Sequence, residues 1–149
     1  MTPQQRAERS ASLMFERDSA SRGLGIHISK VGPGQAVLTM KVTADMLNGH
    51  GICHGGFIFT LADSAFAFAC NSYNKLTVAQ QNQITFVAPG QADDTLTATA
   101  TEVSRTGRSG TYDVTVTDGQ NQTIALMRGL SRTIKGQHFD ESEDQGTPE

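Results

Sequence analysis

The chain has 149 residues, of which 37% are hydrophobic and 18% are charged, and its formal net charge at pH 7 is −3. A chain of this length folds as one ordinary domain and can hold a core without disulfides or a structural metal. A mild acidic excess without a cluster of Lys and Arg argues against nucleic acid as the main partner. The charged fraction is below the usual quarter of residues, which is compatible with surface hidden in an oligomer.

The cysteines, the N-terminal residues and the apolar segments together predict the cellular compartment of the protein. Cys53 and Cys70 have no metal-ligand spacing, and the first twelve residues are polar and do not form a leader sequence. The longest apolar stretch, residues 57–70, is too short to span a bilayer. We therefore expect a cytoplasmic protein with no membrane partner and no cofactor.

Hydrophobic periodicity predicts the first half of the chain. Residues 2–20 read as an amphipathic N-terminal helix, and residues 24–42 alternate on both sides of the Gly32-Pro33-Gly34 turn, which predicts a β-hairpin. Residues 44–54 are rich in Asn, Gly and His and have no period. We expect a long loop there, and long loops inside compact domains are usually functional.

Residues 55–73 are apolar on nearly every face, which is typical of a helix buried on all sides. Four alternating segments follow, at residues 76–87, 95–105, 111–117 and 123–134, and their short connections predict an antiparallel meander. The fold class is therefore α+β: one long helix wrapped by a mainly antiparallel sheet of about six strands. The expected organisation is an N-terminal helix (1–20), the main domain (21–136) and a disordered acidic tail (137–149).

Asp63 is the most informative residue, because it is the only carboxylate in the long apolar helix. A buried carboxylate without a partner costs several kcal/mol or takes a raised pKa. Two interpretations stay open at this point. Asp63 is a general base or nucleophile in an apolar site. Alternatively, it is a structural carboxylate that reaches a polar neighbour such as Ser64, Thr60 or the sheet, or that lies on an exposed stripe of the helix.

His54-Gly55-Gly56 stands where the loop becomes this helix. The first N–H groups of a helix lack internal partners and carry the positive end of its dipole, so they suit a developing oxyanion. If the helix starts at Gly55, Asp63 lies roughly 12 Å further along its axis. Both groups cannot touch one carbonyl, so a working site needs Gly55 and Asp63 from different subunits of a symmetric homodimer.

The chain resembles the hotdog-fold acyl-coenzyme A thioesterases, and within them the phenylacetic acid degradation branch named PaaI or PaaD. The resemblance extends from about residue 23 to residue 134. It is carried by the motifs Leu47-Asn48-Gly49-His50, Cys53-His54-Gly55-Gly56, Leu61-Ala62-Asp63, Ala69-Cys70-Asn71-Ser72, Ala88-Pro89-Gly90, Tyr112-Asp113-Val114 and Arg128-Gly129.

This resemblance implies hydrolysis of an aryl-acetyl or related coenzyme A thioester without a metal. We expect the homodimers to pair further into a tetramer, and a simple dimer is the alternative. In the reaction that the resemblance implies, the Gly55 N–H polarises the thioester carbonyl and Asp63 activates water or attacks directly. Asn48 and His54 orient water, substrate or the loop, although a turn role for Asn48 and a packing role for His54 stay open.

Four further residues are expected at the substrate. Arg105 and Arg108 flank the Thr106-Gly107 turn and are candidates for the coenzyme A phosphates, with solvated surface charge as the alternative. Gln81 and Asn82 belong to a run of four amides that is unusual in a strand, and are candidates for contact with a polar acyl group. An amide ladder or a subunit contact is the alternative.

Two rival functions are open. Asp45 and His50 have the spacing of the loop dyad of hotdog hydratases, which would use His50 as base and leave Asp63 unexplained. A non-catalytic acyl-coenzyme A sensor needs no acid on the helix and usually carries a DNA-binding segment, for which the N-terminal segment is too short and not basic enough. A metal site at Cys53, His50 and His54 lacks a further firm ligand.

Overall fold

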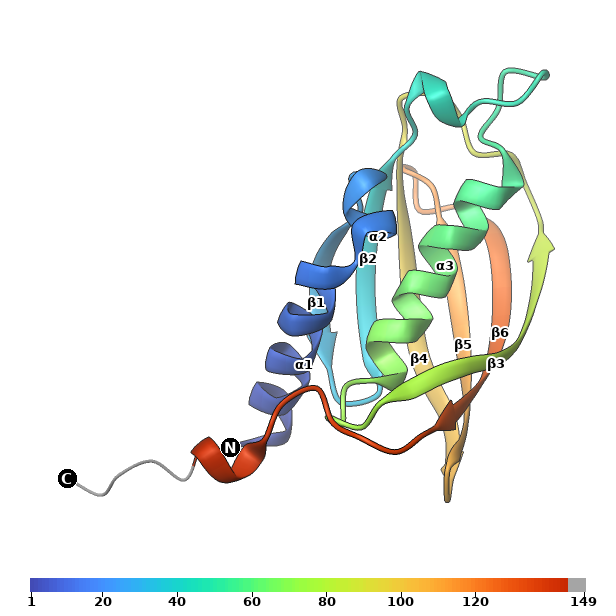
Figure 1. Cartoon of the computed structure of the whole chain (residues 1–149). Helices are drawn as coiled ribbons and strands as arrows, with labels where there is room; N and C mark the ends of the chain where they lie inside the picture. Colours follow the sequence, from blue (N-terminus) through green and yellow to red (C-terminus); the bar gives the residue numbers. More distant parts are fainter. Residues whose placement is uncertain (145–149) are drawn as a thin grey trace.

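In the computed structural model of the chain, which describes residues 1–144, six strands form one antiparallel sheet that wraps around a central helix (Figure 1). The strands are β1 (His27–Gly32), β2 (Gln35–Lys41), β3 (Thr77–Phe86), β4 (Thr95–Thr106), β5 (Ser109–Thr117) and β6 (Thr123–Thr133). The central helix is α3 (Gly55–Cys70), and the short 3-10 helix η1 (Ala44–Met46) lies in the loop that leads to it. This is the α+β architecture that the sequence predicts, with one long helix wrapped by a six-stranded antiparallel sheet.

The strand order is β1-β2-β4-β5-β6-β3, so the expected simple meander is wrong at β3. Strands β4, β5 and β6 do follow one another through short turns. Strand β3 instead follows α3, which crosses the sheet, so the chain enters at the far edge and pairs with β6. Residues 87–94 then return to β4, which pairs with β2. The two edge strands are therefore β1 and β3.

Helix α3 lies across the concave face of the sheet and fills the core with it (Figure 1). Its side chains are apolar on most faces because β2, β4 and β5 curve around it. The close approach of α3 to β6 needs a residue without a side chain at Gly129, where a Cβ atom would come within 2.9 Å of the Phe66 ring. Phe66 in turn packs edge-on against Tyr112, with ring centroids 5.5 Å apart.

The predicted N-terminal helix is two helices, α1 (Pro3–Arg17) and α2 (Ser19–Gly23). Thr2 and Gln5 form a reciprocal capping box at the start of α1. Asp18 interrupts the helix and caps α2 by accepting a hydrogen bond from the Ser21 N–H at 2.9 Å. Helix α1 packs against β1 and α3. None of the helices in residues 1–144 has the length and apolar character needed to span a bilayer.

The segment expected to be disordered is ordered over residues 137–142, and residues 145–149 lie outside the described part. Phe139 is buried beneath the Arg9 guanidinium, which lies 4.3 Å from its ring centroid. Glu141 forms a two-point ion pair with Arg6 of α1. The Asn74 side chain also bonds the backbone of this segment. An acidic composition predicts disorder only where no such anchors exist.

The Arg6 guanidinium, followed by Asn74, lowers the pKa of Glu141 from 4.5 to about 2. A carboxyl group with a lowered pKa stabilises the fold above its unfolded pKa and loses that contribution as the pH falls. We expect the stability advantage of the wild type over Glu141→Gln to disappear between pH 4.5 and about 2. Urea unfolding at several pH values measures it, with Glu8→Gln as the control on α1. A constant difference across this range would contradict the ion pair.

Candidate active site

Helix α3 begins with a free amide. His54 has extended backbone angles, and its Nδ1 accepts a hydrogen bond from the Gly56 N–H at 2.9 Å, so His54 is the N-cap of the helix. The Gly55 N–H forms no hydrogen bond among the described residues. As the first residue of the helix it has no intrahelical carbonyl partner and lies at the positive end of the dipole. The start of α3 thus offers one N–H donor to a ligand.

Phe86 packs against the helix start beside this donor and was not identified from the sequence. A Cβ atom at position 55 would lie 3.0 Å from Phe86 Cζ, so glycine lets the β3 ring pack directly on the helix start. Phe86 is nevertheless 50% exposed, and its neighbour Val87 is 55% exposed. Exposed apolar residues at the end of an edge strand are a signal for contact with a ligand or a second chain.

A groove of about 470 Å³ runs beside the helix start, and we name it the helix-start groove. Its lining is mainly apolar. The residues that line it are Asn48, Ile52, Cys53, Gly55, Ile58, Phe86, Val87, Ala88 and Pro89. Asn48 shapes the loop at its rim, because Asn48 Oδ1 accepts hydrogen bonds from the N–H groups of His50 (2.9 Å) and Ile52 (3.4 Å). The structure thus brings Asn48, His54 and Gly55 together.

Asp63 is half-buried in the middle of α3, and its Oδ1 accepts a hydrogen bond of 2.7 Å from Asn82 Nδ2 on β3. Burial raises the pKa of Asp63 above its ordinary value, the hydrogen bond from Asn82 opposes this, and the charge of Asp18 adds to the rise. A carboxylate with a raised pKa is better suited to take a proton from water. Asp63 therefore has the environment of a general base, and its partner is on the sheet.

The Asn82 side chain forms its hydrogen bond with Asp63. Its Nδ2 bonds the carboxylate, while its Oδ1 is buried without a hydrogen-bond partner and faces Gly129. A buried amide oxygen without a partner is costly, so the contact that holds Asn82 in this orientation has to compensate. Gln81 is exposed, and alternation along β3 directs it to the face opposite Asp63. The structure does not bring Gln81 and Asp63 together.

Gly55 and Asp63 stay apart within one chain. They lie on the same straight helix, eight residues apart, so roughly 12 Å separates them along the axis. The described chain therefore carries two separate groups, the amide of Gly55 with Asn48 and His54, and the carboxylate of Asp63 with Asn82.

The two arginines lie at the opposite end of the sheet from Gly55, around the β4–β5 turn (Figure 1). The Arg105 guanidinium stacks 3.5 Å above the Tyr73 ring and lies 3.6 Å from the Glu102 carboxylate. Arg108 is exposed in the turn itself, and its carbonyl accepts a hydrogen bond from the Thr133 N–H. Both positive side chains are thus near solvent, and Arg105 has a defined orientation.

The remaining candidates do not assemble. Asp45 and His50 are both exposed and form no hydrogen bond or ion pair with each other among residues 1–144. Within the same residues, no group of three or more His, Cys, Asp or Glu side chains has metal-binding geometry.

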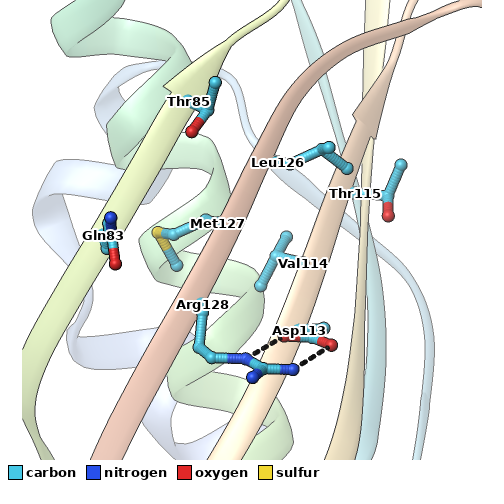
Figure 2. A pocket seen from close by; sticks show the side chains of 8 residues that line it. All are labelled: Gln83, Thr85, Asp113, Val114, Thr115, Leu126, Met127 and Arg128. Carbon is cyan, nitrogen blue, oxygen red and sulfur yellow. Dashed lines mark hydrogen bonds and ion pairs between the residues drawn. The ribbon is translucent and has the colours of Figure 1, made fainter.

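A second groove, of about 340 Å³, lies on the outer face of β3, β5 and β6, and we name it the outer groove (Figure 2). The strands separate it from α3, and Arg128 forms a two-point ion pair with Asp113 at one end. Gln83 and Thr85 line it on β3. It contains neither Gly55 nor Asp63, so the helix-start groove is the better candidate site.

The fold, a long helix wrapped by an antiparallel sheet, agrees with comparisons with known proteins. The family model of the thioesterase superfamily matches residues 50–125. The chain belongs to this superfamily, and it is a thioester hydrolase with the hotdog fold.

Individual relatives are similar over most of the chain. The acyl-coenzyme A thioesterase PaaI of Escherichia coli is 48% identical over 131 residues, which cover 88% of this chain and 94% of the relative. The structure of the E. coli PaaI protein from the phenylacetic acid degradation operon has a TM-score of 0.90 at 46% identity and covers 91% of this chain and 99% of that one. A hypothetical thioesterase of Streptococcus pneumoniae, solved with coenzyme A, has a TM-score of 0.75 at 28% identity over 85% of this chain and 96% of its own.

Replacing Asn82 by Ala removes the hydrogen bond that favours the charged form of Asp63, so we expect the pKa of Asp63 to rise further. Carbon-13 NMR of the Asp63 carboxyl group, assigned with Asp63→Asn, measures the titration midpoint. Gln81→Ala, on the opposite face of β3, is the matched control and should leave the midpoint unchanged. A midpoint that stays or falls in Asn82→Ala would show that this hydrogen bond does not hold the carboxylate.

Proposed function

We propose that the protein is an acyl-coenzyme A thioesterase that hydrolyses aryl-acetyl thioesters, such as phenylacetyl- or hydroxyphenylacetyl-coenzyme A, to the free acid and coenzyme A. The observation that carries this proposal is Asp63, a half-buried carboxylate with a raised pKa on an apolar helix. The similarity to E. coli PaaI supports the acyl-coenzyme A substrate, and the S. pneumoniae relative with coenzyme A supports binding of the carrier.

Gly55 supplies the electrophilic half of the mechanism. The thioester carbonyl oxygen accepts a hydrogen bond from the Gly55 N–H, which becomes stronger as negative charge develops on that oxygen. Gly55 also lets the substrate approach the backbone closely. His54 keeps the helix start in place by capping Gly56, and Asn48 holds the loop at the rim of the groove.

Asp63 supplies the other half by one of two routes. As a general base it takes a proton from water, the resulting hydroxide adds to the carbonyl, and the tetrahedral intermediate expels the thiolate of coenzyme A. As a nucleophile it displaces the thiolate and forms a mixed anhydride, which water then hydrolyses. In both routes the Asn82 amide orients the carboxylate.

The separation of Gly55 and Asp63 supports a homodimer with two shared sites, in which each site takes Gly55 from one subunit and Asp63 from the other. Strand β3 offers the surface for such a dimer, because it is an edge strand of ten residues with exposed apolar side chains at both ends. Pairing β3 with its own copy about a two-fold axis would run the two α3 helices antiparallel on the same face.

The helix geometry suggests where that axis passes. The Asp63 of one subunit is level with the partner's helix start if the axis lies midway between Gly55 and Asp63, roughly 6 Å along the helix from each. Asn82 marks the level of Asp63 on β3, and about 6 Å is two strand residues. The axis would then pass close to Ile84, and the free edge of β3 extends on both sides of this residue.

The shape and charge of the surroundings support the substrate class. The helix-start groove is mainly apolar and large enough for a phenyl ring, with Phe86 beside the Gly55 amide. In the two-fold arrangement the partner's helix start lies on the same side of the axis as Arg105 and Arg108, which we propose as contacts for the coenzyme A phosphates. We further propose that dimers pair into a tetramer through exposed apolar residues such as Val103 and Leu126.

The test is thiol release from a panel of phenylacetyl-, hydroxyphenylacetyl-, benzoyl- and straight-chain coenzyme A esters, with wild type and Asp63→Ala. We expect the highest kcat/KM for the aryl-acetyl esters, and a fall of at least about 100-fold in Asp63→Ala because the base or nucleophile is lost. Binding of coenzyme A and oligomeric state should be retained. Asp45→Ala is the matched control and should keep full activity. Unchanged turnover in Asp63→Ala would contradict the mechanism, and a preference for straight-chain esters would contradict the substrate class.

A further inference from the structure

A buried chain of hydrogen bonds connects the N-terminal segment to the turn of α3 that carries Asp63. Asp18 Oδ2 lies 2.6 Å from Ser21 Oγ, and Ser21 Oγ lies 2.8 Å from Ser64 Oγ. Ser21 and Ser64 are only 1% and 9% exposed, and Ser64 is the residue directly after Asp63. Buried hydroxyl groups need partners, and these two find each other between α2 and α3.

The carboxylate of Asp18 determines which hydroxyl group donates in each of these hydrogen bonds. An ionised carboxylate only accepts hydrogen bonds, so the single hydroxyl hydrogen of Ser21 points to Asp18. Ser21 Oγ must then accept from the Ser64 hydroxyl. Ser64 thus donates away from its own helix and toward Asp18, where a mid-helix serine often bonds the carbonyl one turn back.

We propose that Asp18 is a positioning residue for Asp63, which ties the α1–α2 junction to the catalytic turn of α3 through Ser21 and Ser64 and keeps a second negative charge near the catalytic carboxylate. This proposal rests on the catalytic role proposed above for Asp63. It makes the N-terminal segment a part of the active-site machinery, although that segment lies outside residues 50–125, which match the superfamily model.

The electrostatic surroundings of Asp63 are simple enough for this role. Among residues 1–144, the charged or titratable groups that act on Asp63 or respond to it are Asp18 from the α1–α2 junction and the Cys70 thiol on its own helix. Burial raises the pKa of Cys70 to about 12, so it is neutral near pH 7. Strand β3 contributes the neutral amide of Asn82. Asp18 is therefore the charge that works with burial to raise the pKa of Asp63.

Asp18→Asn is the direct test of the charge, because asparagine caps a helix as well as aspartate does but carries no charge. Its Nδ2 would donate to Ser21 Oγ, so the three side chains stay connected while the Ser21 hydroxyl turns toward Ser64. We expect the acid limb of the pH profile of kcat/KM, and the carbon-13 titration of the Asp63 carboxyl, to move to lower pH. Glu16→Gln removes one charge two residues away, at an exposed position that takes no part in the hydrogen bonds between Asp18, Ser21 and Ser64. It should shift neither the acid limb nor the carbon-13 titration. Asp18→Ser, which also caps without charge, replaces Asp18→Asn if that variant is unstable.

Ser64→Ala separates the effect of the hydrogen-bond connection from the effect of the Asp18 charge. It keeps Asp18 but cuts the chain, so we expect kcat to fall while the acid limb stays at the wild-type pH. An Asp63 midpoint that does not move in Asp18→Asn, or that moves equally in Glu16→Gln, would overturn the proposal, as would an unchanged kcat in Ser64→Ala. Failure of the proposed function shows separately, as full activity in Asp63→Ala. In that case the carbon-13 titration of Asp63 in the wild type and in Asp18→Asn still tests the effect of the Asp18 charge.

Discussion

The structure depends on the burial of one helix that is apolar on nearly every face yet carries a carboxylate. Helix α3 can leave water only if a sheet wraps around it, and the six strands do so. Asp63 can share that environment only with a hydrogen-bond donor and some access to solvent, and Asn82 and its half-buried position supply both. The same burial raises the pKa of the carboxyl group, so the feature that costs stability also favours proton transfer.

A second constraint follows from the length of the helix. The free amide at Gly55 and the carboxylate at Asp63 cannot meet in one chain, because a straight helix holds them roughly 12 Å apart. In the proposed homodimer a single chain is half of each of two sites, and the unpaired edge of β3 is the surface we propose for the second copy. The low charged fraction of the sequence fits this view, since part of the surface would be interface.

Much of this could be predicted from sequence because periodicity and turn residues are local signals. The buried helix, the four long strands after it and the special position of Asp63 and Gly55 all follow from such patterns. Partners across space do not: Asn82 belongs to an amide run with no local sign that one of its members bonds Asp63, and the edge position of β3 depends on where α3 crosses the sheet. Ordering of the C-terminal segment depends on Phe139 and Glu141 finding partners on α1, which composition cannot show.

The most direct test of the shared site is a mixed dimer of two inactive variants, Asp63→Ala and Gly55→Val, whose added side chain meets Phe86 at the helix start. In a dimer with shared sites, one site of each mixed dimer keeps an intact Gly55 from one subunit and an intact Asp63 from the other. Co-refolding equal amounts should therefore restore about a quarter of wild-type thioesterase activity, since half of the dimers are mixed and each has one working site. No recovery in verified mixed dimers would contradict the shared site.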